Sequence, residues 1–172
     1  DYAEGWSNKG VTLHELKRFE EAITHHNKAL LLNPNFAESY SCLGVTFTDL
    51  GRFEEALTHH DKALTINPDY AVGWFNKGIT LTKLNRHNEA IICYENALRL
   101  NPDIYWGLGE LVHSKMKVCS WAGLSDSLAH ISKNVMANLK VTDPFTLLSI
   151  SDDPLLHRQA ARIFSEDKFP EN

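Results

Sequence analysis

The amino-acid sequence predicts an all-α fold, a right-handed superhelical stack of helix-turn-helix hairpins that ends in a carboxy-terminal helical cap. The first observation is an internal repeat of about 34 residues, which aligns three units almost without gaps. The second is that small and large apolar residues recur at helical spacing in each unit. The third is an Asn-Pro pair that stops the second helix of each unit, because proline cannot donate a hydrogen bond to the preceding turn; the pairs begin at Asn33, Asn67 and Asn101.

The composition limits the function classes. The chain has 172 residues, which is enough for one domain with a sizeable core and too few for two ordinary catalytic domains. Hydrophobic residues make up 43% and charged residues 23%, as in a globular protein, and the apolar runs are too short to cross a bilayer. A formal charge of -5 gives no basic surface for phosphates. We therefore expect neither nucleic acid nor a membrane as partner.

The cysteines indicate the cellular compartment of the protein, and the first residues indicate how far the repeat array extends. Cys42, Cys93 and Cys119 are odd in number and widely spaced, without the pairing typical of zinc sites or disulfide frameworks. This usage fits a reducing compartment, and we expect a cytoplasmic protein. The sequence opens at Asp1 inside the repeat pattern and without a leader, so we expect further repeats upstream in a longer protein.

The three repeat units cover residues 1–34, 35–68 and 69–102. Six positions recur in each unit: Trp6, Gly10, Leu13, Ala22, Ala29 and Pro34, then Tyr40, Gly44, Phe47, Ala56, Ala63 and Pro68, then Trp74, Gly78, Leu81, Ala90, Ala97 and Pro102. The small residues at two of these positions let antiparallel helices approach, and the large residues fill the space between them. This pattern resembles the tetratricopeptide signature closely.

Each unit is predicted to contain two helices. Left-handed residues at Lys17, Gly51 and Asn85 would end the first helices, with some conformational cost at the lysine. The predicted first helices are 3–16, 37–50 and 71–84, and the predicted second helices are 19–32, 53–66 and 87–100. Because one hairpin cannot bury its apolar face alone, neighbouring hairpins should stack, and the first helices should line a concave surface.

After Pro102 the signature fades, and residues 103–140 read as a degenerate fourth repeat followed by a capping helix. We expect one helix over 103–117 and a longer amphipathic helix over 121–140. Residues 141–172 then form short helices and a tail, a possible linker to another domain. Asp143 and Asp153 each precede a proline, which predicts two helix starts. The last helix should cover 154–165, with a frayed tail over 166–172.

Five short stretches characterise the carboxy-terminal part of the sequence. They are Cys119-Ser120-Trp121, Pro144-Phe145, Leu147-Leu148, Asp152-Asp153-Pro154-Leu155 and Ala160-Ala161-Arg162. Together they resemble the junction between repeats and catalytic domain in the O-linked N-acetylglucosamine transferases, glycosyltransferase family 41.

In that family the repeats select protein substrates, and a following two-lobed domain transfers the sugar. The resemblance implies that the present chain recognises substrates and stops before the enzyme. Where animal members carry a histidine-rich stretch, this sequence has Asp143-Pro144-Phe145-Thr146, so no catalytic histidine is carried over.

Histidine pairs at His25-His26 and His59-His60 suggest a metal site or a packing role. Neighbours on a helix diverge by about 100 degrees, so one pair cannot chelate one ion. His26 and His60 also share a repeat position with Tyr94, which favours packing. We find no nucleophile arrangement and no phosphate-binding loop. The chain is therefore predicted to be no enzyme and to need no cofactor or metal.

The concave groove is the candidate binding site for a protein or peptide. Asn8 and Asn76 occupy places at which the transferase family uses asparagines to grip a peptide backbone; the alternative is that they only solvate a polar helix face. Chaperone-type carboxylate clamps need several cations here, and this groove lacks them. The expected lining residues are Glu4, Ser7, Asn8, Val11, His14 and Glu15, then Glu38, Ser41, Cys42, Val45, Thr48 and Asp49, then Val72, Phe75, Asn76, Ile79, Thr82 and Lys83.

Two other functions compete with peptide binding. The chain could be a homo-oligomerising scaffold that self-associates through its exposed first hairpin. It could also be an RNA-binding helical array, which the acidic balance disfavours. The sequence favours a peptide-binding module, because Val11, Val45, Ile79 and Phe75 give the groove an apolar floor.

Overall fold

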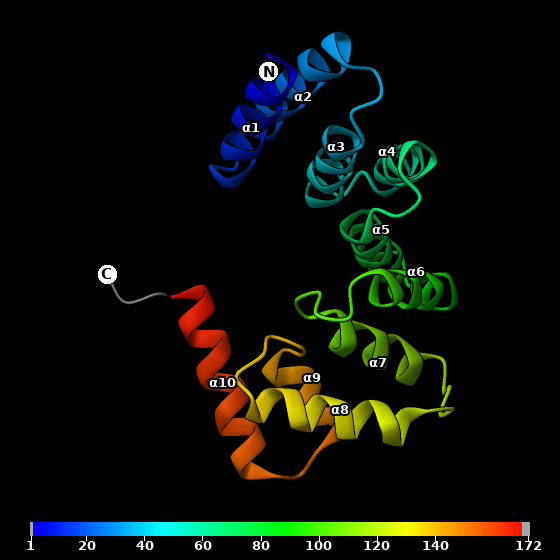
Figure 1. Cartoon of the computed structure of the whole chain (residues 1–172), viewed down its shortest axis with the longest axis vertical. Helices are drawn as coiled ribbons and strands as arrows, with labels where there is room; N and C mark the ends of the chain where they lie inside the picture. The colour runs from blue at the N-terminus through cyan, green and yellow to red at the C-terminus, as the bar shows by residue number, and fades with distance from the viewer. Residues whose placement is uncertain (1, 170–172) are drawn as a thin grey trace. The chain divides into compact units, whose positions relative to one another are not determined.

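The computed structural model describes residues 2–169, and this part of the chain is all-α, as predicted (Figure 1). The second helices of the three repeats begin and end at the predicted residues, and the first helices agree within one residue. The helices are α1 (Tyr2–Glu15), α2 (Phe19–Leu32), α3 (Ala37–Asp49), α4 (Phe53–Ile66), α5 (Ala71–Lys83), α6 (His87–Leu100), α7 (Gly107–Lys117), α8 (Leu124–Met136), α9 (Pro144–Ile150) and α10 (Pro154–Lys168).

The chain divides into two compact units. Unit 1 (Asp1–Arg86) contains α1 to α5, and unit 2 (His87–Asn172) contains α6 to α10. The boundary falls inside the third sequence repeat. Unit 1 therefore contains two complete hairpins and the first helix of the third, which are the elements of the predicted groove.

Small residues hold the hairpins of unit 1 together. Ala22 and Ala56 are completely buried, and Ala56 packs with Leu43 and Phe47 in one apolar cluster. The pairs α1 with α2 and α3 with α4 are visible as neighbouring helices in Figure 1. These small residues lie on the face of each second helix that contacts its first helix. The opposite faces of the first helices remain free of this contact and together can form one surface.

The turns after the first helices use the predicted left-handed residues. Lys17, Gly51 and Asn85 have φ angles of 61°, 75° and 58°. Each turn is closed by a backbone hydrogen bond, such as that from the Arg52 N–H to the Phe47 carbonyl at 2.8 Å. Lys17 has a Cβ in this conformation, which costs about 1 kcal/mol relative to an ordinary helical residue.

Unit 2 has its own apolar core, but its helices differ from the predicted ranges. The predicted helix over 103–117 begins only at Gly107, because Trp106 before it has a φ of 63°. The predicted helix over 121–140 is shorter at both ends, since Gly123 and Asn138 have positive φ angles of 68° and 62°. The core residues are Val112, Ile131, Val135, Val141, Leu147, Leu156, Ala160 and Ile163.

Aspartate caps begin the last two helices, as predicted. The Asp143 carboxylate accepts hydrogen bonds from the N–H groups of Phe145 and Thr146, and Asp153 accepts one from Leu155. The prediction of a frayed tail from residue 166 is wrong up to Lys168, since α10 reaches that residue. Asp167, which lies in this last turn, is bound by Lys140. The rest of the predicted tail, 170–172, lies outside the described residues.

Candidate peptide-binding groove

Two neighbouring cavities lie between the first helices of unit 1. The first lies between α1 and α3 and has a volume of about 100 Å³; the second lies between α3 and α5 and has about 140 Å³. Val45 of α3 lines both cavities, so the two adjoin along this helix. The first is lined by Val11, His14, His26, Cys42, Val45 and Thr46, and the second by Val45, Thr48, Asp49, Asn76, Ile79 and Lys83.

The repeat generates both cavities from equivalent positions. Val11, Val45 and Ile79 are spaced by 34 residues, and each stands on the outward face of a first helix. Cys42 and Asn76 are likewise equivalent. Each cavity therefore lies where two successive repeats meet, and its character depends on residues from both repeats.

Most of the cavity lining was predicted from the repeat phase. The sequence did not identify Thr46 or the ring of His26 as cavity residues. Thr46 is completely buried and donates a hydrogen bond to the Cys42 carbonyl at 2.9 Å, so it forms part of the cavity floor. Its equivalent, Thr80, is also buried, and this shared β-branched polar position was the signal available in the sequence.

Ser7 and Ser41 lie beneath the surface of the groove. They are 4% and 1% exposed. The Ser7 hydroxyl lies 3.4 Å from Nδ1 of His26, and the Ser41 hydroxyl accepts a hydrogen bond from the Asn76 amide at 3.2 Å. Their structural role is to orient His26 and Asn76 from below, and they present no exposed hydroxyl to a ligand.

The remaining predicted lining residues differ in exposure. Asn8 is exposed, while Asn76 is half-buried and held by Ser41. Val72 is 43% exposed and Phe75 is half-buried, so α5 contributes apolar surface beside the second cavity. The acidic residues at the amino-terminal ends of α1 and α3, Glu4 and Glu38, are both exposed.

The charge of the groove is mainly acidic. His14 lines the first cavity, with Nε2 3.2 Å from the Asp49 carboxylate and Nδ1 3.1 Å from the Thr46 hydroxyl. Glu4, Glu15 and Glu38 add negative charge along the first helices, and Lys83 is the cation among the lining residues. The potential in the groove therefore favours neutral or basic ligands over acidic ones.

Cys42 is a poor nucleophile. Burial, together with the nearby Glu38 carboxylate, raises the pKa of its thiol to about 11. The thiol is therefore protonated at neutral pH, and thiolates, not thiols, react and bind metals. Cys42 contributes an apolar wall to the first cavity.

The paired histidines occupy packing positions. His26 and His60 are completely buried, and burial lowers the pKa of each to about 4. No group of three or more His, Cys, Asp or Glu residues that could hold a metal occurs between residues 2 and 169. No helix in the same range is long and apolar enough to cross a membrane.

Comparisons with solved structures identify similar helical arrays. The first TPR of Spaghetti (RPAP3), bound to the HSP90 peptide SRMEEVD, has 22% identity and a TM-score of 0.66, covering 69% of this chain and 94% of that one. The Arabidopsis OM64 TPR domain has 23% identity and a TM-score of 0.62, covering 66% and 94%. The Sgt2 TPR domain from Aspergillus fumigatus has 19% identity and a TM-score of 0.65, covering 67% and 78%. At these identities the likeness shows the fold.

Sequence comparison gives the family. No curated protein matches the sequence significantly. The family model of the tetratricopeptide repeat matches residues 3–36, 37–70 and 71–104, which together make up more than half of the chain. The period, the hairpins and the similar structures agree with this match, and the chain belongs to the tetratricopeptide repeat family.

Proposed function

We propose that this chain is a protein-interaction module that binds a segment of another protein in the groove of unit 1. The observation that carries the proposal is the pair of cavities that share Val45. Each cavity has the size of a single side chain, and both have apolar walls. A peptide with two apolar anchors would fill them and bury Val11, Val45 and Ile79 from water.

The spacing of the cavities favours a particular ligand conformation. Packed helices lie about 8–10 Å apart, so cavities between successive first helices should be separated by a similar distance. A polyproline II segment rises about 3.1 Å per residue and returns to the same face every third residue, which gives about 9 Å between such side chains. We therefore propose anchors at positions i and i+3 of an extended peptide.

The acidic groove supports a basic or neutral ligand. The peptide in the similar RPAP3 structure, SRMEEVD, carries three acidic residues near its end. In the present groove such a peptide would meet Glu38 and Asp49, with Lys83 as the cation among the lining residues. We propose instead that lysine or arginine flanks the two apolar anchors, because opposite charges speed association and exclude wrong partners.

A substitution at the shared wall tests the proposal. Short peptides selected by display against the intact protein would be measured by fluorescence polarisation. Val45→Glu places a charged, larger side chain between both cavities and should weaken binding by about tenfold or more, since a desolvated carboxylate would face apolar anchors. Ile92→Glu makes a comparable change at an exposed position of unit 2 and should leave the affinity unchanged. Equal affinity of the Val45→Glu variant and the intact protein would refute the groove as the site.

The resemblance of the carboxy-terminal residues supports a narrower proposal. We infer that the groove presents protein substrates to a glycosyltransferase of the O-linked N-acetylglucosamine type. The support is the set of junction residues, among them Cys119-Ser120-Trp121 and Ala160-Ala161-Arg162. The three free thiols further support a reducing, cytoplasmic setting. Reading the gene beyond the codon for Asn172 tests this proposal, and a gene without a nucleotide-sugar domain there would contradict it.

The alternative function is a scaffold that self-associates through the first hairpin. It is favoured by one observation, the exposure of Tyr2 at 85% on α1. Sedimentation at high protein concentration distinguishes it from the peptide-binding module, because a monomeric mass throughout would exclude the scaffold. Both functions can be tested on the same protein preparation.

A further inference from the structure

Helix α10 has two faces of different composition. Its inner face carries Leu156, Ala160 and Ile163, which are buried in the core of unit 2. Its outer face carries one apolar and three polar residues at the spacing that places them side by side on a helix. Because the core side of α10 is already buried, the outer face is a surface in its own right. The outer residues are Leu155, Arg158, Gln159 and Arg162.

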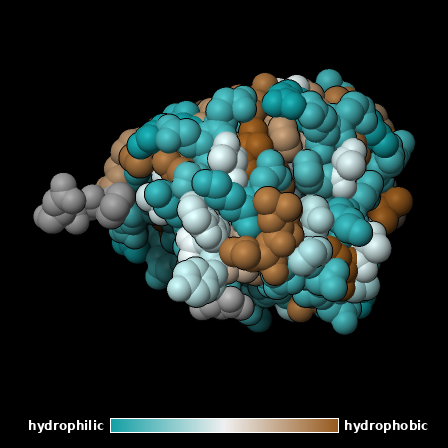
Figure 2. Space-filling model, turned by 90° about the horizontal axis from the view of Figure 1, so that it is seen from above, coloured by the Kyte–Doolittle hydropathy of each residue, from teal (hydrophilic) through white to brown (hydrophobic). Residues whose placement is uncertain are grey.

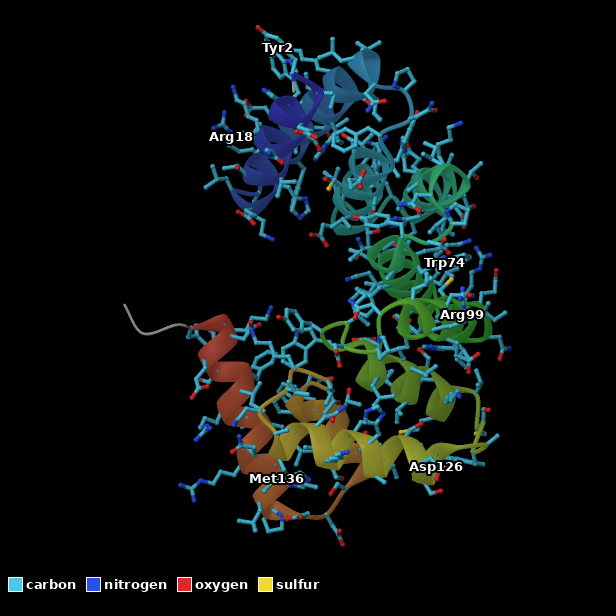
Figure 3. The ribbon with its side chains drawn as sticks, in the orientation of Figure 1. Tyr2, Arg18, Trp74, Arg99, Asp126 and Met136 are labelled. Atoms are coloured by element: carbon cyan, nitrogen blue, oxygen red, sulfur yellow. The ribbon has the colours of Figure 1, made fainter. Side chains whose placement is uncertain are left out.

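The outer face of α10 borders an open hollow within unit 2. The hollow has a volume of about 550 Å³, and α8 contributes its last residue, Met136, to the lining. Figure 3 shows the labelled Met136 at the end of α8 that lies beside α10, with which α8 is in contact. We name this site the α8–α10 hollow. Its lining residues are Met136, Leu155, Arg158, Gln159 and Arg162.

The apolar part of the hollow consists of Met136 and Leu155. These side chains are 59% and 67% exposed. Brown apolar side chains also lie exposed among teal ones on the face seen in Figure 2, so exposure alone identifies no site. What distinguishes this pair is that two guanidinium groups line the same hollow. A ligand there would cover apolar surface and meet positive charge at the same time.

Asn138 holds the polar part of the hollow in place. Its side-chain oxygen accepts a hydrogen bond from the Gln159 amide and another, at 2.9 Å, from the Arg162 guanidinium. Asn138 follows α8 directly and has a φ of 62°. Because two side chains of α10 share this acceptor, they have less freedom to lose when a ligand binds.

The charge of the hollow is positive. Arg158 forms no ion pair with any residue in the described part of the chain. The Arg162 Nε lies 3.5 Å from the carboxylate of Glu166, one turn further along α10. Two guanidinium groups therefore face one carboxylate, and this balance suits a ligand with a single negative charge. A phosphate group, with a charge of roughly -1.5 to -2, would also be repelled by Glu166.

We propose that the α8–α10 hollow binds an acidic amphipathic helix of a partner protein. A glutamate of this helix pairs with Arg158 and Arg162, whose planar guanidinium groups bind carboxylates through paired hydrogen bonds. An apolar residue one turn away packs on Met136 and Leu155. The hollow belongs to unit 2 and the groove to unit 1, so the proposal does not depend on the proposed function.

The spacing along α10 supports a helical ligand. A helix rises about 1.5 Å per residue, so the midpoint between the two arginines lies about 7.5 Å along the axis from Leu155. Two ligand residues four positions apart on one helix face are separated by about 6 Å along the axis, and the long arginine side chains span the difference. A helix also satisfies its own backbone polar groups, as contact with the apolar pair requires.

Fluorescence anisotropy with a synthetic probe tests this proposal. The probe is a labelled, acetylated and amidated alanine-rich peptide of about 20 residues, which is long enough to form a helix in water. It carries glutamate and leucine four positions apart on one face. We expect saturable binding to the intact chain that weakens as salt is added. A probe with glutamine in place of glutamate should bind about fivefold more weakly.

Charge reversal assigns the binding to the hollow. Arg158→Glu should weaken binding by about tenfold, because repulsion replaces attraction. A probe with lysine in place of glutamate should bind this variant better than it binds the intact chain. Arg99→Glu reverses an exposed arginine on α6, labelled in Figure 3, and should leave the affinity unchanged. Arg158 has no described ion pair to lose, so its variant should unfold at the same urea concentration as the intact chain, which separates lost binding from lost folding.

Several results would overturn the proposal. They include no saturable binding at probe concentrations up to about 1 mM, and equal affinities of the Arg158→Glu variant and the intact chain. Tighter binding of a phosphoserine probe than of the glutamate probe would show a phosphate site instead. Self-association of the unmodified chain that Arg158→Glu abolishes would show that a second copy occupies the hollow. Loss of probe binding in Val45→Glu but not in Arg158→Glu would place the probe in the groove of unit 1.

Discussion

The imidazole of His60 packs directly on Gly44, so that a Cβ built at the glycine would lie 2.4 Å from Cε1 of the ring. His26 packs on Gly10 in the same way, with Nε2 2.7 Å from such a Cβ. A buried histidine therefore takes the place that Tyr94 holds in the third repeat, and the glycine opposite makes room for it. This contact explains the second histidine of each pair. The first histidines, His25 and His59, are only partly buried on the same helices.

Gly44→Ala should destabilise unit 1 by about 2 kcal/mol, because overpacking a buried ring costs more than the better helix propensity of alanine returns. The ring cannot move aside into solvent, since His60 is completely buried. Urea unfolding followed by circular dichroism measures the change. Gly5→Ala is the matched control on an open helix face and should stabilise the protein by up to about 1 kcal/mol. Equal effects of the two substitutions would contradict the packing argument.

The stability of unit 1 should fall in weak acid. Burial lowers the pKa of His60 from 6.5 to about 4. Above pH 6.5 the ring is neutral in both the folded and the unfolded chain, so its contribution is constant. Between pH 6.5 and about 4 only the unfolded chain takes up the proton, and the free energy of unfolding falls, by roughly 3 kcal/mol for this group over the whole range. Urea titrations at several pH values measure the slope.

His60→Phe should remove this part of the pH dependence and stabilise the protein at neutral pH. Both ring nitrogens of His60 lack a hydrogen-bond partner among the described residues, so an apolar ring relieves about 1–3 kcal/mol of unsatisfied polar burial. His26→Phe is the comparison, because Nδ1 of His26 lies within 3.4 Å of Ser7 and 3.3 Å of Ser39. The second substitution should stabilise less. A larger gain for His26→Phe would contradict this account.

The repeats made unit 1 predictable. The Asn-Pro pairs end the second helices through local backbone chemistry, and the 34-residue period gives the same helix bounds in all three repeats. The phase also placed Val11, Val45 and Ile79 on one surface. The burial of Ser7 and Ser41 could not be predicted, because it depends on how far each first helix is rotated toward the histidine and asparagine that it contacts.

Unit 2 was predicted less well because tertiary contacts determine its helix ends. The Trp106 N–H donates to the Lys140 carbonyl at 2.6 Å, and this contact accompanies the left-handed turn that delays the start of α7. The sequence of residues 103–106 gives no indication of this hydrogen bond to Lys140, which lies 34 positions further along the chain. The two aspartate-proline starts were predictable, since the cap and the proline act within one turn.

Gly109→Ala should disrupt this contact between α7 and the segment that precedes α9. A Cβ at Gly109 would lie 2.5 Å from the Thr142 hydroxyl and 2.8 Å from its Cα, so backbone must move. The Gly109 N–H also donates to the Val141 carbonyl at 2.8 Å, which fixes the approach. We expect a loss of about 3 kcal/mol of stability in urea unfolding, larger than for Gly44→Ala, where a side chain is the obstacle. Ser125→Ala, at an exposed position of α8, should be neutral.

The two aspartate caps of unit 2 should differ in strength. Asp143 accepts two backbone hydrogen bonds, both at 2.9 Å, whereas Asp153 accepts one at 2.8 Å. Asp143→Ala should therefore cost more than Asp153→Ala, with both near 1 kcal/mol, and asparagine at either position should retain most of the stability. Hydrogen exchange at the Phe145 and Leu155 amides reports each cap separately. Asp152→Ala removes a neighbouring exposed carboxylate and is the control; the same loss there would show that net charge, and not capping, stabilises these helices.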